Sequence, residues 1–156
     1  MSAALILAIG CATPTQQTKP QTVAFVEADF DKFAGTGTAT VQGSAFLKTR
    51  SGDVKVGAGS TIELVPATPY TIERFGAPAG TSWEPRDPRL AKHLRTTLGD
   101  AQGAFEFKNI PAGDYFLAAI IQWEYVDGGN TRQTGGQPIT RFSIAAGETK
   151  KIVLTR

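Results

Sequence analysis

Residues 97–117 read TLGDAQGAFEFKNIPAGDYFL and carry the clearest structural pattern in the chain. In the middle of this stretch, Phe105 and Phe107 alternate with charged residues. Because successive side chains of a β-strand point to opposite faces, the alternation predicts a strand with one buried face. Gly103 before it and Pro111 after it are turn residues. The stretch therefore predicts two strands joined by a tight connection.

The same combination of short apolar segments and turn residues continues on both sides. Extended segments separated by turns, at intervals of about ten residues, are typical of an all-β sandwich. The longest of them, Tyr115–Val126, is the most apolar and is expected to be the central strand, whereas Asp127–Pro138 is expected to be a hairpin loop. The other expected extended segments are Thr38–Thr49, Val54–Val56, Thr61–Ala67, Tyr70–Phe75, Thr96–Leu98, Ala104–Lys108, Ile139–Ile144 and Thr149–Leu154.

Two segments show helical rather than strand patterning. Asp87 can cap a helix that begins at Pro88, and Leu90 and Leu94 would share its apolar face, so a short helix is expected there. Val23–Phe33 has apolar residues at helical spacing and is either a short amphipathic helix or an irregular extended arm.

Composition limits the possible functions. The chain has 156 residues, of which 41% are apolar and 19% charged, as in an ordinary folded domain. Its formal net charge is only +2, which argues against a dedicated nucleic-acid-binding protein. Its single cysteine, Cys11, rules out an internal disulfide.

The position of Cys11 suggests a role in membrane attachment. The apolar run Ala3–Ile9 is too short to span a bilayer, which takes about 20 residues, but it suits the core of a signal peptide. Residues 7–11, LAIGC, resemble the lipobox of bacterial lipoproteins. The resemblance implies cleavage before Cys11 and acylation of this residue, and two or more acyl chains anchor a protein stably. The alternative is a buried N-terminal strand with an incidental cysteine.

These features predict a signal peptide over 1–10, a lipidated cysteine with tether and arm over 11–34, and a sandwich over 35–156. The polar, proline-containing segment 12–22 suits a flexible tether. No Lys or Arg precedes the apolar run, so we expect the true start to lie upstream. By the sorting pattern of Gram-negative lipoproteins, Ala12 favours the outer membrane.

Residues 97–117 also resemble the characteristic motif of carboxypeptidase regulatory-like domains. The matching positions are Thr97, Asp100, Gly103, Phe105, Phe107, Pro111, Gly113, Tyr115 and Leu117. The resemblance implies a transthyretin-like, seven-stranded antiparallel β-sandwich that serves as an accessory or interaction module. The chain departs from the family pattern by an insertion at Tyr70–Arg95, which carries the expected short helix.

Catalysis is not expected. A nucleophilic site would need His93, the only histidine, which we expect to be a solvated residue on a surface helix. Zinc sites need several Cys or His ligands, and the acidic residues Glu27, Asp29 and Asp31 lack the spacing of a calcium loop. We therefore expect no enzyme activity, no cofactor and no metal.

The candidate partner-binding or ligand-binding residues are aromatic residues and nearby arginines, because such groups anchor proteins and stack on sugars. Trp83 lies in a proline-rich loop of the insertion and either marks a binding surface or packs this loop onto the sandwich. Trp123 and Tyr125 alternate on one strand face, which is either core or exposed. The candidates are Trp83, Arg86, Arg89, Tyr70 and Trp123.

Two functions remain open at this point. The first is an envelope lipoprotein that acts as a protein-interaction or assembly module, with the insertion as recognition element, or as an accessory subunit of a larger envelope complex. The alternative is a carbohydrate-binding lipoprotein that recognises peptidoglycan or surface polysaccharide.

Overall fold

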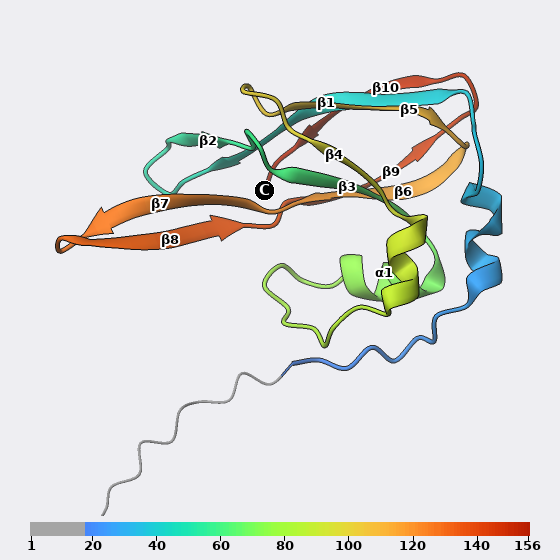
Figure 1. Cartoon of the computed structure of the whole chain (residues 1–156), viewed down its shortest axis with the longest axis horizontal. Coiled ribbons are helices and arrows are strands. Elements are labelled where there is room, and N and C mark those ends of the chain that lie inside the picture. The colour runs from blue at the N-terminus through green and yellow to red at the C-terminus, as the bar shows by residue number, and fades with distance from the viewer. Residues whose placement is uncertain (1–17) are drawn as a thin grey trace, which may run out of the picture.

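Two four-stranded sheets face each other across a hydrophobic core (Figure 1). The structure is a computed structural model that describes residues 18–156. The expected all-β sandwich with a short helix is confirmed. The predicted signal peptide, residues 1–10, and the predicted lipidation site, Cys11, lie outside the described residues.

The first sheet is built around β1 (Ala39–Lys48). On one side β1 pairs in parallel with β10 (Thr149–Leu154), and on the other it pairs antiparallel with β5 (Ala104–Ile110). The short strand β2 (Val54–Val56) pairs antiparallel with the last residues of β1. The predicted fully antiparallel arrangement is therefore wrong for β1 and β10, which are the first and last strands of the domain and run in the same direction.

The second sheet is antiparallel throughout. Its strands are β4 (Arg95–Leu98), β3 (Thr61–Pro66), β6 (Gly113–Ala119) and β9 (Ile139–Ile144), in that order. The predicted core positions Phe105, Phe107 and Tyr115 are all buried between the two sheets. Gly103 and Gly113 have φ of +73° and +151°, a backbone conformation that side chains of L-residues rarely adopt.

Strand β6 is buried on both of its faces, which explains why its sequence is so apolar. Tyr115 and Leu117 point into the sandwich, whereas Phe116 and Ala118 belong to a second apolar cluster on the outer face of the sheet. Phe75 from the insertion packs on Phe116, with ring centroids 5.7 Å apart. The insertion therefore covers part of the outer face of the second sheet.

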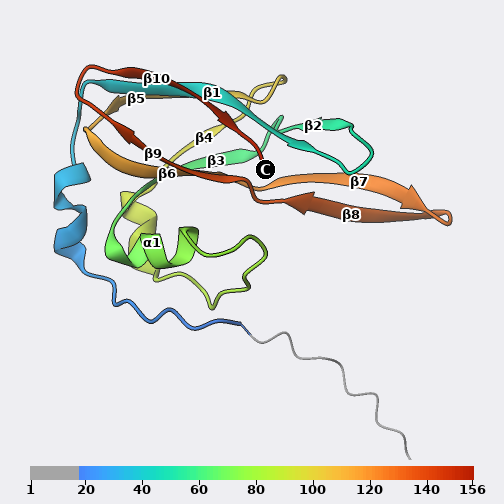
Figure 2. The same cartoon turned by 180° about the vertical axis from the view of Figure 1, so that it is seen from behind.

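The insertion begins with α1 (Pro69–Phe75), where an extended segment was expected, so that prediction is wrong. The helix forms because Thr68 and Thr71 make a reciprocal capping box and Pro69 occupies the first turn. Tertiary packing then fixes it, since Tyr70 and Phe75 are buried. α1 lies below the second sheet in Figures 1 and 2.

Two further helical segments are 3-10 helices. The short helix expected after Asp87 is present as η2 (Pro88–His93), and the Asp87 carboxylate accepts a hydrogen bond from the Arg89 N–H at its start. The N-terminal arm contains η1 (Glu27–Phe33), which buries Phe30 and Phe33. The helical alternative for this arm is thus the one observed.

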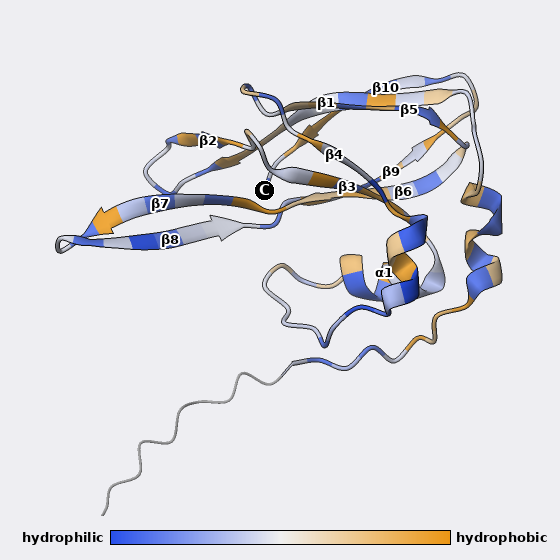
Figure 3. Ribbon diagram, viewed as in Figure 1, coloured by the Kyte–Doolittle hydropathy of each residue, from blue (hydrophilic) through white to orange (hydrophobic). Residues whose placement is uncertain are grey.

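The apolar run 115–126 is not one strand, as the sequence predicted. It breaks at Ile120, and β7 (Ile121–Asp127) leaves the sheet to pair with β8 (Asn130–Gly136), in the segment expected to be a loop. The described residues therefore contain ten strands instead of the predicted seven. The β7–β8 hairpin projects beyond the sheets in both views, and β8 is mostly hydrophilic (Figures 2 and 3).

Candidate functional site

A long groove runs beside the junction of β6 and β7. It consists of two adjoining hollows of about 530 Å³ and 830 Å³, which share Glu63, Ile120 and Gln137 in their linings. The loop that follows α1 lies below this junction in Figure 1 and lines the larger hollow. We call the combined hollow the insertion groove. Its length and openness suit an extended ligand better than a small enclosed one.

One end of the insertion groove is lined by uncharged polar side chains. Three glutamines, Gln122, Gln133 and Gln137, line it together with Ser60 and Thr61. Each amide offers both a donor and an acceptor, and each hydroxyl can do either. The exposed side chain of Ile120, 59% accessible, adds an apolar surface between the two hollows. The side chains at this end can therefore hydrogen-bond to hydroxyl-rich molecules that carry no charge.

The other end of the groove contains Trp83, which is half-buried. Two cations lie over its ring: Lys19 Nζ is 4.6 Å from the ring centroid and Arg74 Cζ is 5.7 Å from it. Lys19 and Trp83 also form an isolated parallel β-bridge. Trp83 thus lines the groove and joins the insertion to Lys19 of the N-terminal segment.

Three arginines, Arg74, Arg86 and Arg156, line the same hollow as Trp83. Arg86 donates two hydrogen bonds to the Glu63 carboxylate, at 2.9 and 3.1 Å, and this pairing raises the pKa of Arg86. Arg74 Nη2 donates to the backbone oxygen of Glu84 at 2.9 Å. Burial lowers the pKa of Arg74, and the neighbouring charge of Arg86 lowers it further. The sequence identified Arg86 as a candidate but missed Arg74, which it placed in an extended segment.

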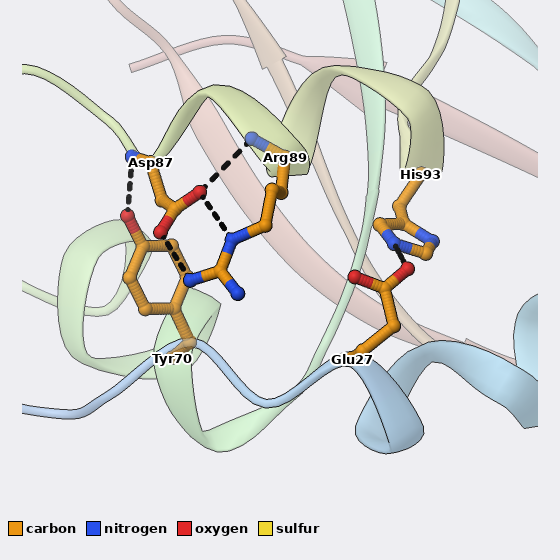
Figure 4. A network of polar contacts seen from close by, with 5 residues as sticks. All are labelled: Glu27, Tyr70, Asp87, Arg89 and His93. Atoms are coloured by element: carbon orange, nitrogen blue, oxygen red, sulfur yellow. Dashed lines mark hydrogen bonds and ion pairs between the residues drawn. The ribbon is translucent and has the colours of Figure 1, made fainter.

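Two other candidates, Tyr70 and Arg89, belong to a structural network on the far side of the insertion (Figure 4). Tyr70 is buried, and its hydroxyl accepts a hydrogen bond from the Asp87 N–H at 2.9 Å. Arg89 is held by the Asp87 carboxylate at 2.7 Å and lies over the Phe25 ring at 4.7 Å. These contacts tie the N-terminal arm to the insertion, and neither residue lines the insertion groove.

The prediction that His93 is solvated is wrong. Its side chain is 16% exposed and stacks on Phe30, with ring centroids 4.3 Å apart. His93 Nε2 lies 2.9 Å from the Glu27 carboxylate, which also pairs with Lys92 at 2.6 Å (Figure 4). His93 therefore belongs to the packing between η1 and η2.

Trp123 lies apart from the groove. It is partly buried against the main core, whereas Tyr125, two residues further along β7, is 44% exposed. Of the five candidates, only Trp83 and Arg86 therefore line the groove. The groove residues Glu63, Gln133 and Gln137 were not recognised from the sequence, because they come from β3, β8 and the loop before β9.

Within residues 18–156, His, Cys, Asp and Glu form no group of three or more that could hold a metal ion. None of the helices in this part of the chain is both long and apolar enough to cross a membrane.

Comparison with solved structures identifies a protein of similar fold. No protein-family model matches the chain, and no curated protein matches it. A solved structure similar to the chain is that of a candidate carbohydrate-binding protein from Pseudomonas aeruginosa, with a TM-score of 0.74 and 25% sequence identity. The match covers 85% of this chain and 97% of the Pseudomonas protein. The two proteins therefore share a fold over almost the whole of the neighbour.

Proposed function

We propose that this chain is a non-catalytic, carbohydrate-binding lipoprotein of the bacterial cell envelope. The observation that carries this proposal is the insertion groove, in which an aromatic ring, an exposed aliphatic side chain and several planar amides line one continuous surface. The likeness to a candidate carbohydrate-binding protein of the same fold supports it.

The lining suits the chemistry of sugars. A sugar ring has hydroxyls around its edge and C–H groups on its faces, so a binding site needs planar hydrogen-bonding groups beside apolar surface. Gln122, Gln133 and Gln137 can make paired hydrogen bonds to neighbouring hydroxyls. Ile120 and Trp83, which line the groove, offer apolar contact. Two adjoining hollows of about 530 and 830 Å³ leave room for more than one sugar unit.

The proposed location at the outer membrane rests on the N-terminal sequence. Acylation of Cys11 would hold the domain at a membrane through the tether, with the outer membrane as the favoured site. In this proposal the sandwich is a carboxypeptidase regulatory-like domain, supported by the motif in residues 97–117, and the insertion is its binding element.

A glycan array probed with the full-length protein in detergent tests the function. We expect binding to oligosaccharides of envelope or surface polysaccharides, and a loss of about tenfold or more in affinity for Gln137→Ala and Trp83→Ala. Tyr125→Ala is the matched control, because it removes an exposed aromatic residue outside the groove. Absence of binding to every glycan would overturn the proposal.

A second candidate function, protein interaction within an envelope assembly, is favoured by the β7–β8 hairpin. It projects from the sandwich and exposes Tyr125 and Val126, the latter 75% accessible. Its two strands pair only with each other among the described strands, so each has an edge on which a strand of another protein could add. Cross-linking in native membranes tests this candidate: Val126→Lys should abolish a specific cross-linked partner, whereas Gln137→Ala should leave it.

A further inference from the structure

The two ends of the insertion groove differ sharply in charge. The glutamine end is uncharged apart from Glu63, whereas the Trp83 end is lined by Arg74, Arg86 and Arg156. Lys19 adds a fourth cation over the Trp83 ring. Glu63 is the one acidic side chain in the lining of either hollow.

The guanidinium of Arg74 has one nitrogen without a hydrogen-bond partner among the described residues. Its Nη1 atom is buried and makes no hydrogen bond with any residue in 18–156, while its Nη2 atom donates to the Glu84 backbone oxygen. A buried donor on a charged group is costly to leave unpaired. The guanidinium is held in place by Trp83 and one backbone oxygen, and its positive charge lies in the lining of the larger hollow.

The neighbouring charges point to the kind of acceptor. Arg74 and Arg86 repel each other, since the charge of Arg86 helps to lower the pKa of Arg74. Glu63 already balances Arg86 through its two hydrogen bonds. Arg74 has no carboxylate within salt-bridge distance among the described residues. An anionic group in the hollow that Arg74, Arg86 and Arg156 line would reduce the repulsion between their charges.

We infer that the arginine end of the insertion groove binds an anionic substituent, so that the glycans recognised are acidic: uronic acids, or sugars that carry phosphate or sulfate. This inference rests on the proposed carbohydrate-binding function and specifies its ligand class. Neutral sugar units would occupy the glutamine end, and the acidic unit would lie beside Trp83.

The test uses pairs of glycans that differ only in charge. A glycan array presents each acidic backbone beside its neutral form, such as oligogalacturonate beside its methyl ester, and phosphorylated or sulfated chains beside the unmodified ones. The full-length protein should bind the acidic member of a pair at least about tenfold more tightly. Its affinity should fall as the salt concentration rises, because the attraction is electrostatic.

Variants locate the effect. Arg74→Gln and Arg156→Gln should each weaken binding of the acidic glycan by about fivefold or more, and by more than they weaken binding of its neutral counterpart. Lys151→Gln removes the same charge from β10, outside the groove, and should have no effect. Glu63→Gln should strengthen binding of the acidic glycan, because it removes the carboxylate that opposes an anion.

The possible failures are distinguishable. Equal binding of acidic and neutral members, or preference for neutral ones, would overturn the ligand class while leaving carbohydrate binding in place. Binding of acidic glycans that is unaffected by Arg74→Gln and Arg156→Gln would overturn the assignment to this end of the groove. Absence of binding to every glycan would overturn the proposed function itself.

Discussion

The carboxylate of Glu73 accepts a hydrogen bond from the backbone N–H of Val23 at 2.8 Å, across fifty residues of sequence. The same carboxylate accepts hydrogen bonds from the backbone N–H and hydroxyl of Thr22 and from the Gln21 amide. One side chain of α1 therefore holds three consecutive residues of the N-terminal segment against the insertion. Through this clamp the segment that leads to the proposed anchor is joined to α1 of the insertion.

Removal of the clamp should free the N-terminal segment without unfolding the sandwich. In Glu73→Ala, the amides of Thr22 and Val23 lose their acceptor, and we expect them to lose most of their protection from hydrogen exchange. Exchange at core amides such as Leu117 should not change. Glu84→Gln is the control, because Glu84 is exposed and uses its backbone in these contacts. Unchanged exchange at Thr22 and Val23 in Glu73→Ala would contradict the clamp.

The clamp should also weaken in acid. Hydrogen bonds from Thr22 and Val23 lower the pKa of Glu73 below its ordinary value of 4.5. A carboxylate whose pKa is lowered on folding stabilises the folded form above 4.5, and this contribution is lost as the pH falls through the lowered pKa. Exchange at Val23, corrected for its intrinsic pH dependence, should rise over that acidic range. The rise should be absent in Glu73→Gln, and its persistence there would show that another group is responsible.

Gly43 is expected to be essential for the parallel pairing of β1 with β10. A Cβ atom at Gly43 would lie 1.7 Å from the backbone oxygen of Ile152, so the strands would have to separate. Gly43→Ala should therefore lower the free energy of unfolding by about 3 kcal/mol, the upper end of ordinary overpacking. Gly59→Ala, at φ +69° with nothing within 4 Å, should cost only about 1–2 kcal/mol of backbone strain. Denaturant unfolding of both variants measures the difference, and equal costs would argue against this close approach.

Two leucines provide a matched test of the core. Leu117 on β6 is fully buried between the sheets, whereas Leu98 on β4 is 64% exposed. Leu117→Ala should lower the free energy of unfolding by about 2–5 kcal/mol through lost burial and the cavity that remains. Leu98→Ala should change it by less than about 0.5 kcal/mol. Thermal and denaturant unfolding give both values, and a large loss for Leu98→Ala would mean that this face of the sheet is covered.

Local patterns predicted the parts of the fold that depend on local chemistry. The alternation at Phe105 and Phe107 predicted β5, and Asp87 before Pro88 predicted η2. The break at Ile120 was missed because one buried strand and two strands in different sheets have the same continuous apolar sequence pattern. α1 was missed because its signal is a pair of threonines, Thr68 and Thr71, whose capping role shows only once the helix has formed.

The sequence alone established the fold class. Burial of alternating side chains and the conformational limits of glycine and proline act over a few neighbouring residues. They can therefore be recognised from the linear sequence. Only the tertiary structure established which residues meet. The insertion groove joins Glu63, Trp83 and Gln137 from three separate segments, and its charge depends on how their neighbours pair. Distances across such a groove are set by sheet register and packing, which no local pattern encodes.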